Sequence, residues 1–268
     1  GPLYHPVILA EEIATLDVVT EGRLIFGVGL GYRREEFDWL GVPYRQRGAR
    51  LDEALVLMKR LWTEDEVTFN GRFWRLEGAK PHIRPVQEPH PPIWVGGNAD
   101  PGVRRAGRLG DAYACPPKAS LPVVASRYRI VEEEFARRGK PFGPQPLRRE
   151  VLVADTEQQA IDEYVRVAQS RYVTYSERGN DVLAGRDLVS DFYNSVKDHV
   201  VVGTPESVTQ RLVDIVTNLP VDPLLMRPQW PTMSADETIA AIRRLGRDVL
   251  PHLLLLEPTT HINGEMFG

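Results

Sequence analysis

The hydrophobic positions of the chain follow two alternating patterns. Apolar residues at helical spacing predict helices over about 6–21, 49–62, 101–109, 121–138, 156–169, 203–216 and 235–250, with a shorter one at 35–40. Short apolar runs between them, near residues 24, 93, 111, 150 and 223, predict buried strands. Because strands and helices alternate, the strands are expected to be parallel, which indicates an α/β fold.

Three segments depart from this alternation. Residues 67–76 have the period of a β-hairpin, in which Asn70 and Gly71 are expected to supply the positive φ angles of a tight turn. The five prolines between residues 81 and 92 predict an extended connection. Residues 170–200 have weak periodicity and mixed charge, and are predicted to be a partly helical insertion.

Two of the predicted strands end in glycines. Gly27, Gly29 and Gly31 alternate along the first strand and its exit, and Gly96 and Gly97 follow the second. Glycine has no Cβ, so a ligand can approach the backbone closely, and the amides of a following helix N-terminus suit a phosphate. In a parallel barrel, function collects at the C-terminal ends of strands. Position alone therefore selects the exits 29–32, 96–98, 115–117 and 227–230.

A Rossmann domain is the first alternative. The dinucleotide fingerprint requires a third glycine where this chain has Tyr32, and the nearest acidic residue at the expected spacing, Asp52, falls inside a predicted helix. A rival phosphate site lies at 203–207, where Thr204 and Pro205 fit the start of a helix and Glu206 would repel phosphate. Those residues therefore predict a helix cap.

The exit of the last strand carries a guanidinium, an amide and an indole, from Arg227, Gln229 and Trp230. These groups suit an aromatic or anionic ligand, although a surface loop anchored by Trp230 would explain them equally well.

Composition narrows the classes of function. The chain has 268 residues, of which 42% are apolar and 26% charged, as in ordinary globular proteins. A formal net charge of -4 argues against a nucleic-acid or anionic-membrane binder, and the longest apolar runs are too short for a membrane span. The single cysteine, Cys115, fits a reducing cytoplasm and a small buried residue. No nucleophile elbow, Walker loop or metal-ligand spacing of histidines occurs.

The order of several motifs points to a known family. They lie at 5–17, 22–29, 33–42, 47–51, 62–63, 91–97 and 202–205, and include Pro-Pro-Ile-Trp-Val-Gly-Gly at 91–97 and Val-Gly-Thr-Pro at 202–205. In these motifs and their spacing the chain resembles the luciferase-like flavin monooxygenases, the bacterial luciferase superfamily. The resemblance implies a TIM (β/α)8-type barrel that uses reduced FMN or the deazaflavin F420.

The resemblance also implies where the cofactor binds. The flavin phosphate and ribityl chain would lie against the exits of two strands, and the last exit would border the flavin ring or the substrate. The expected cofactor-binding residues are Gly29, Leu30, Gly31, Tyr32, Gly96, Gly97, Asn98 and Gly102. The expected border residues are Arg227, Gln229 and Trp230.

The chain departs from the family at its start. Family members have two more strands and most of a third before the position of His5, which is roughly 50 to 60 residues by the size of a βα unit. We therefore expect an N-terminally truncated barrel, with one domain over 1–251 and a tail over 252–268. Catalytic residues on the missing strands cannot be named.

The resulting expectation is a cytoplasmic flavin-dependent monooxygenase. It would use reduced FMN and O₂ on a small organic substrate, form a homo-oligomer and work beside a separate flavin reductase. The first alternative is F420-dependent hydride transfer, for which Arg33, Arg34 or Arg104 could attract the acidic tail of the cofactor. The second is a non-catalytic flavin-binding barrel.

Overall fold

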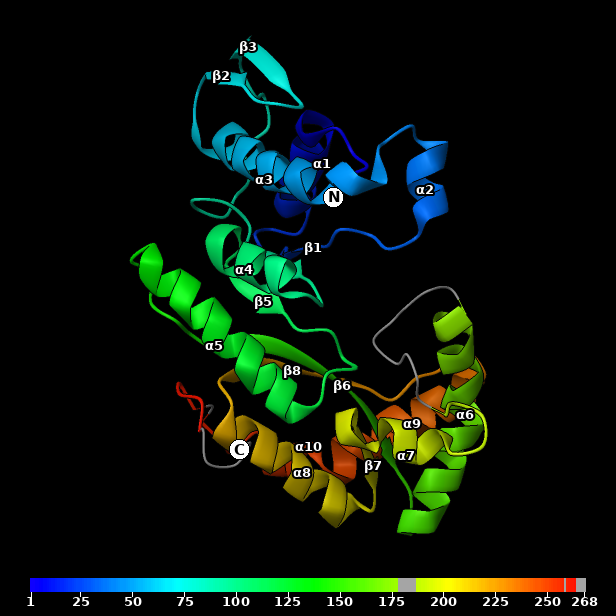
Figure 1. Ribbon diagram of the computed structural model, residues 1–268. Coiled ribbons are helices and arrows are strands. Elements are labelled where there is room, and N and C mark those ends of the chain that lie inside the picture. Colours follow the sequence, from blue (N-terminus) through cyan, green and yellow to red (C-terminus); the bar gives the residue numbers. More distant parts are fainter. Residues whose placement is uncertain (178–186, 258, 264–268) are drawn as a thin grey trace. The chain divides into compact units, whose positions relative to one another are not determined.

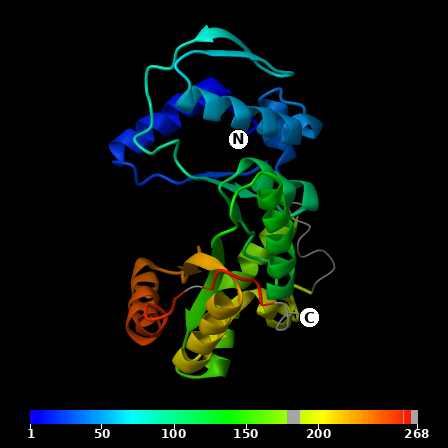
Figure 2. The same ribbon diagram turned by 90° about the vertical axis from the view of Figure 1, so that its left-hand side faces the viewer.

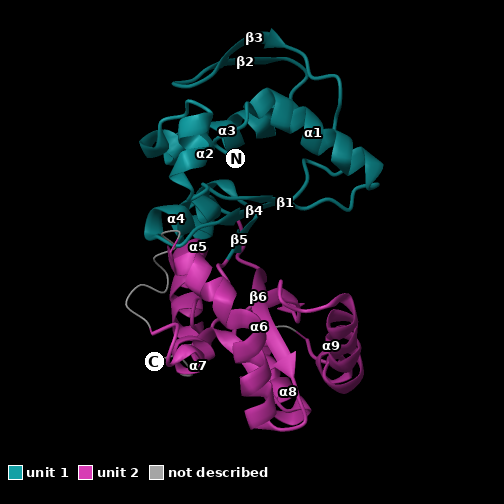
Figure 3. Cartoon of the chain, turned by 90° about the vertical axis from the view of Figure 1, so that its right-hand side faces the viewer, with its two compact units in different colours: residues 1–114, 133–139 teal, residues 115–132, 140–268 magenta. Residues whose placement is uncertain are grey.

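The computed structural model describes residues 1–177, 187–257 and 259–263 (Figure 1). The chain divides into two compact units (Figure 3). Unit 1 comprises residues 1–114 and 133–139, and unit 2 comprises residues 115–132 and 140–268. Each unit has its own parallel sheet of three strands.

In unit 1 the strand order is β1–β4–β5. These strands are β1 (Phe26–Val28), β4 (Ile93–Gly96) and β5 (Ala112–Ala114). The helices are α1 (Pro6–Val19), α2 (Arg34–Trp39), α3 (Arg47–Thr63) and α4 (Asp100–Leu109). An antiparallel hairpin of β2 (Val67–Asn70) and β3 (Arg75–Ala79) lies on the side of α3 that faces away from β1 (Figures 1 and 2).

In unit 2 the strand order is β7–β6–β8. The strands are β6 (Gln145–Val153), β7 (Val200–Gly203) and β8 (Val221–Arg227). The helices are α5 (Leu121–Arg137), whose last turn is assigned to unit 1, α6 (Glu157–Glu177), α7 (Phe192–Val196), α8 (Pro205–Asn218), α9 (Ala235–Asp248) and α10 (Leu250–Leu253).

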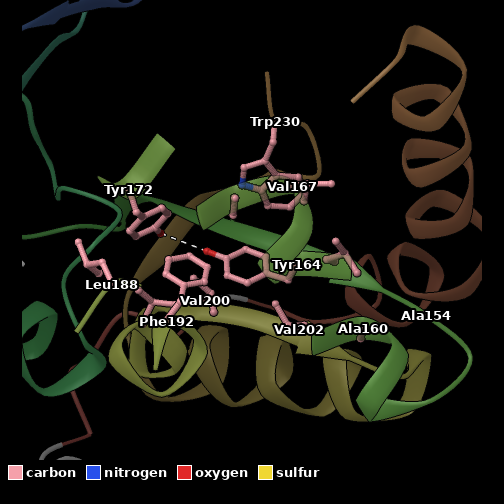
Figure 4. Close-up of a cluster of buried hydrophobic side chains, with 13 residues drawn as sticks. Ala154, Ala160, Tyr164, Val167, Tyr172, Leu188, Phe192, Val200, Val202 and Trp230 are labelled. Carbon is pink, nitrogen blue, oxygen red and sulfur yellow. Dashed lines mark hydrogen bonds between the residues drawn. The ribbon is translucent and has the colours of Figure 1, made fainter. Parts of the chain in front are cut away.

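The core of unit 2 is rich in aromatic side chains (Figure 4). Ala160, Tyr164, Ala168 and Tyr172 recur every four residues along α6 and are all buried. The ring of Tyr164 stacks on Phe192 with the centroids 5.7 Å apart. This stripe explains why α6 runs to residue 177, beyond the predicted end at 169, and takes in the first part of the predicted insertion. Residues 178–186 of that insertion lie outside the described residues.

The five predicted strands are confirmed, and the structure adds β7. Val200, Val201 and Val202 are β-branched and buried, although β7 is an edge strand of its three-stranded sheet. The run is short and passes directly into the cap of α8, so its hydrophobic pattern is inconspicuous in the sequence.

The hairpin is confirmed, but the predicted turn is wrong. Neither Asn70 nor Gly71 has a positive φ angle. The connection instead closes with the Gly71 amide donating to the Trp74 carbonyl over 2.9 Å. The connection is therefore a wider loop than a tight Asn-Gly turn. Its backbone amides donate to a carboxylate from a helix.

That carboxylate belongs to Glu53 of α3. It accepts hydrogen bonds from the amides of Arg72, Phe73 and Trp74 at 2.9, 2.9 and 3.0 Å. A Cβ at position 71 would overlap the same carboxylate, so glycine is required there for close approach and not for its φ angle. The hairpin is thus shaped by a residue about 20 positions earlier.

The extended connection before β4 is confirmed, and Asp17 holds it in place. This aspartate is buried near the end of α1 and accepts from the amides of Val86 and Gln87 at 2.8 and 2.9 Å. The Gln87 side chain also donates to Asp17, at 2.6 Å, and to the Leu24 carbonyl, at 2.7 Å. The carboxylate therefore joins α1, the entry to β1 and the proline-rich segment.

In the described part of the chain, no helix combines the length and apolarity needed to cross a bilayer. The division into one domain over 1–251 and a tail over 252–268 stays a prediction.

The Glu53 contact generates a test. Replacing Glu53 by alanine leaves three loop amides without their acceptor, and we expect the free energy of unfolding to fall by about 1–3 kcal/mol. Urea denaturation measures the change. Glu66→Ala is the control, because Glu66 pairs with Lys80 on the surface and should cost less than about 0.5 kcal/mol. Equal losses in the two variants would contradict the role given to Glu53.

Candidate functional site

The glycine-rich exits of β1 and β4 lie side by side in unit 1. The strands pair in parallel with Val28 opposite Val95, so both exits emerge at the same edge of the sheet. A Cβ on Gly29 would lie 3.9 Å from the Gly96 carbonyl oxygen, and one on Gly96 would lie 3.8 Å from that of Val28. The predicted neighbourhood of these two exits is confirmed.

Gly97 and Gly102 bring the end of β4 against the start of α4. A Cβ on Gly97 would lie 2.9 Å from the Cα of Gly102, and one on Gly102 would lie 3.1 Å from the Cα of Gly97. The buried Tyr113 of β5 donates its hydroxyl proton to the Gly97 carbonyl over 2.7 Å. This stretch of backbone is therefore held closely, and side chains at both positions are excluded.

The N-terminus of α4 carries amides that could face a ligand. Its N-cap residue, Ala99, makes no side-chain capping hydrogen bond, and Asn98 just before it is exposed. Backbone amides at such a helix start favour an anion, whereas Asp100 in the first turn opposes one. Only part of this first turn can donate to a ligand, because Pro101 has no N–H and the Gly102 amide donates to the Ala99 carbonyl at 2.8 Å. Asp100 weakens an anion site there further.

The other predicted cofactor residues at the exit of β1 are Leu30, Gly31 and Tyr32. Gly31 has a φ angle of +77°, which a side-chain-bearing residue rarely adopts, and a Cβ there would lie 3.3 Å from the ring of Phe37. Leu30 is half-buried. Tyr32 is exposed, and its carbonyl accepts from the Tyr44 hydroxyl at 3.3 Å. The eight predicted cofactor residues therefore all belong to one unit, at neighbouring strand exits.

The rival site at α8 is filled by the chain itself. Thr204 caps the helix, and its amide donates to Glu157 over 3.2 Å. The Ser207 hydroxyl also bonds the Glu157 carboxylate. An acidic group thus occupies the helix N-terminus, and the predicted cap is confirmed.

The predicted border residues belong to unit 2. Arg227 is the last residue of β8, and its Nε donates to the Gln229 carbonyl over 2.8 Å. Gln229 is exposed. Trp230 is fully buried, and its ring meets that of Tyr164 edge to face at 5.5 Å (Figure 4). Its indole anchors the exit, and Arg227 and Gln229 are the groups that remain accessible.

Glu150 of β6 is a buried carboxylate that residue patterns did not single out. Arg227 and Arg171 approach its Oε1, with Nη1 atoms at 3.2 and 3.6 Å. The Tyr164 hydroxyl donates to Oε2 over 2.8 Å. In the sequence, the one signal that could have pointed to Glu150 is its position as a glutamate inside an apolar strand, preceded by two arginines.

Lys118 brings a further cation near this carboxylate. Its ammonium lies 4.3 Å from the ring centre of Tyr172 and 4.8 Å from that of Tyr175. Within the described residues, this buried Nζ has no hydrogen-bond acceptor. Burial lowers the pKa of Lys118 to about 8, against an opposing effect of the Glu150 charge.

Two of the three arginines expected to attract an acidic cofactor tail are already paired. Arg33 bonds Glu36 at 3.0 Å. Arg104 bonds Glu134 at 2.8 Å, and this hydrogen bond is the main cause of its raised pKa. Arg34 lies over the ring of Tyr44 at 5.9 Å. Of the three, Arg34 is therefore the one whose charge is least compensated among the described ion pairs.

The described residues contain no candidate metal site. No group of three or more His, Cys, Asp or Glu side chains that could hold an ion occurs there. Cys115 is buried, as predicted.

A family model described as luciferase-like monooxygenase matches residues 1–222. The chain belongs to this family. The resemblance read from the sequence motifs is thereby confirmed, and so is the luciferase-like TIM-barrel fold class. The family fold agrees with parallel strands linked by helices in both units.

The chain is similar both to proteins named as F420-dependent and to a protein solved with FMN. F420-dependent glucose-6-phosphate dehydrogenase of Kineococcus radiotolerans is 42% identical over 116 residues, which are 42% of this chain and 33% of the relative. F420-dependent hydroxymycolic acid dehydrogenase of Mycobacterium tuberculosis is 35% identical over 113 residues, 41% of this chain and 31% of the relative. The oxygenating constituent of 3,6-diketocamphane monooxygenase from Pseudomonas putida, solved with FMN, has a TM-score of 0.75 and 20% identity, covering 96% and 78%. The matches to the curated relatives thus span about a third of their length.

The lowered pKa of Lys118 predicts how stability changes with pH. Between about pH 8 and 10.5 this lysine is neutral in the folded protein and protonated in the unfolded chain, so the free energy of unfolding should rise with pH. In Lys118→Met this contribution disappears, and the variant should be more stable than the wild type near pH 7. Urea denaturation from pH 7 to 9.5 measures the difference. Lys80→Met, at an exposed lysine, is the control and should show no such trend.

Proposed function

We propose that this protein is an F420-dependent oxidoreductase acting on a small organic substrate. The observation that carries the proposal is the sequence match to relatives named as F420-dependent dehydrogenases, at 35–42% identity over 113–116 residues. When bound, F420 would accept or supply a hydride, without oxygen. The monooxygenase with FMN and O₂ that the family resemblance implies is therefore the second candidate.

The residues of unit 1 fit a deazaflavin or flavin phosphate. At Gly29 and Gly96 the backbone is bare and a Cβ would make only ordinary contacts, while Gly97 and Gly102 pack directly on each other where α4 begins. We call the backbone at these four glycines the cradle. In this proposal the exit from Gly29 to Tyr32 holds one side of the phosphate and ribityl chain, and the backbone from Gly97 to the start of α4 holds the other. These residues bind and orient the cofactor.

The residues of unit 2 support a substrate with a negatively charged group. Arg227 and Arg171 share the single carboxylate of Glu150, and the Lys118 ammonium has no acceptor among the described residues. Three cations therefore face one anion, which leaves a positive surplus. One relative is named for glucose 6-phosphate, a substrate with such a charge.

An FMN-dependent monooxygenase is the second candidate. The observation that favours it is the structural likeness to the FMN-bound diketocamphane monooxygenase. A separate flavin reductase, a homo-oligomeric state and a cytoplasmic location remain predictions.

Cofactor choice is tested by direct binding. We expect the purified chain to quench the fluorescence of F420 on binding, with weaker quenching of FMN under the same conditions. Tighter binding of FMN would favour the monooxygenase candidate. Binding of neither cofactor, oxidised or reduced, would overturn the proposal for this chain.

The cradle is tested at Gly29. A Cβ there meets only the Gly96 carbonyl, at 3.9 Å, so we expect Gly29→Val to fold and yet fill the space offered to the cofactor. We expect at least a tenfold loss of F420 affinity, or about 1.4 kcal/mol, by fluorescence titration. Gly143→Val is the control, because its Cβ meets nothing within 4 Å and it belongs to unit 2. Unchanged affinity in Gly29→Val would refute the placement.

A further inference from the structure

Glu150 gathers donors from α6 and from the segment that follows β8, both in unit 2. It lies within β6 and is 4% exposed. Its Oε2 accepts from the Tyr164 hydroxyl at 2.8 Å, the Tyr172 hydroxyl at 3.1 Å and the Trp230 indole Nε1 at 3.3 Å. Two of these donors belong to α6, and the third follows β8. The carboxylate is therefore held in one orientation by neutral hydrogen bonds.

The other oxygen of this carboxylate faces Arg227. Nη1 of Arg227 lies 3.2 Å from Oε1, and its Nε donates to the Gln229 carbonyl. Glu150 and Arg227 are also register partners on the paired strands β6 and β8. The guanidinium is thus held through two of its nitrogens while the side chain remains 17% exposed. A planar group held through Nε and Nη1 still has the donors of Nη2 to offer to a ligand.

Packing alone does not account for Glu150. Burying a carboxylate costs free energy, and apolar residues of the same volume often stabilise a core as well or better. Neutralising charge accounts for it only in part, because Arg171 and Lys118 still leave the surroundings positive. What the carboxylate adds is a fixed direction for the Arg227 guanidinium.

We propose that Glu150 is a positioning residue, which orients Arg227 to bind an anionic group of phosphate type on the substrate. This inference rests on the proposed function in assigning Arg227 to the substrate. Glu150 itself is enclosed and makes no contact with the ligand. The ligand-facing groups are the exposed parts of Arg227.

The test uses inorganic phosphate as the probe on the full chain. Charge and orientation predict opposite results for Glu150→Gln. Removing a negative charge would by itself tighten phosphate binding, whereas loss of the orienting carboxylate should weaken it about tenfold, the scale of one charge-assisted hydrogen bond. Isothermal titration calorimetry measures the affinity. In the same variant, the indole N–H resonance of Trp230, assigned with Trp230→Phe, should shift because its acceptor has changed.

Glu134→Gln is the matched control. Glu134 is equally buried and also pairs with two arginines, Arg104 and Arg137, but it belongs to unit 1. It should leave phosphate affinity and the Trp230 resonance unchanged. Arg227→Gln should lose phosphate binding to the same extent as Glu150→Gln, and the double variant should lose little more.

Glu150→Asp covers the case in which Glu150→Gln does not fold. It keeps the charge and withdraws the carboxylate by one methylene, so we again expect weaker phosphate binding. Unchanged or tighter binding in a folded Glu150 variant, additive effects in the double variant, or no phosphate binding by the wild type would overturn the inference. Absence of F420 binding is a separate result, and it would count against the proposed function and not against the role of Glu150.

Discussion

The close approach of two backbone segments in unit 1 is the constraint on which the candidate cofactor site depends. Gly97 and Gly102 leave no room for a Cβ between the end of β4 and the start of α4. Their contact brings the first amides of α4 to the edge of the sheet where β1 also ends. The proposed cofactor site would therefore be lined by main chain, which the strands and the helix hold in place without any ordering of side chains.

In each unit a buried carboxylate also holds separate elements together. Asp17 joins α1 to the connection before β4, and Glu150 joins β6 to α6 and to the exit of β8. Each accepts several donors, which offsets the cost of removing the charge from water. Apolar packing alone would bring these elements together, but it would leave the direction of their polar groups undefined. Glu150 shows the consequence most clearly, because the side chain of one of its partners, Arg227, remains 17% exposed.

Much of the fold could be predicted because its signals are local. The helices and the five predicted strands follow from apolar spacing, and Thr204 was recognisable as a cap from its immediate neighbours. The two glycine-rich exits were correctly expected to be neighbours, since parallel strands end at one edge of a sheet. The turn after Asn70 was predicted wrongly, because Glu53, a residue outside the hairpin, decides its shape. Strand β7 escaped notice because its three valines run straight into a helix cap.

The periodicities, the caps and the glycine positions can be read from the amino-acid sequence, and its motifs suffice to recognise the family. Which polar groups meet depends on how the elements pack. Glu150 is 77 residues from Arg227 and 80 from Trp230 in the chain, and strand register is what brings them within hydrogen-bonding distance. The difference lies in how far apart along the chain the interacting residues are. Helix caps and apolar stripes depend on residues three or four positions apart, whereas a buried charge is satisfied by whichever donors the packed elements place around it.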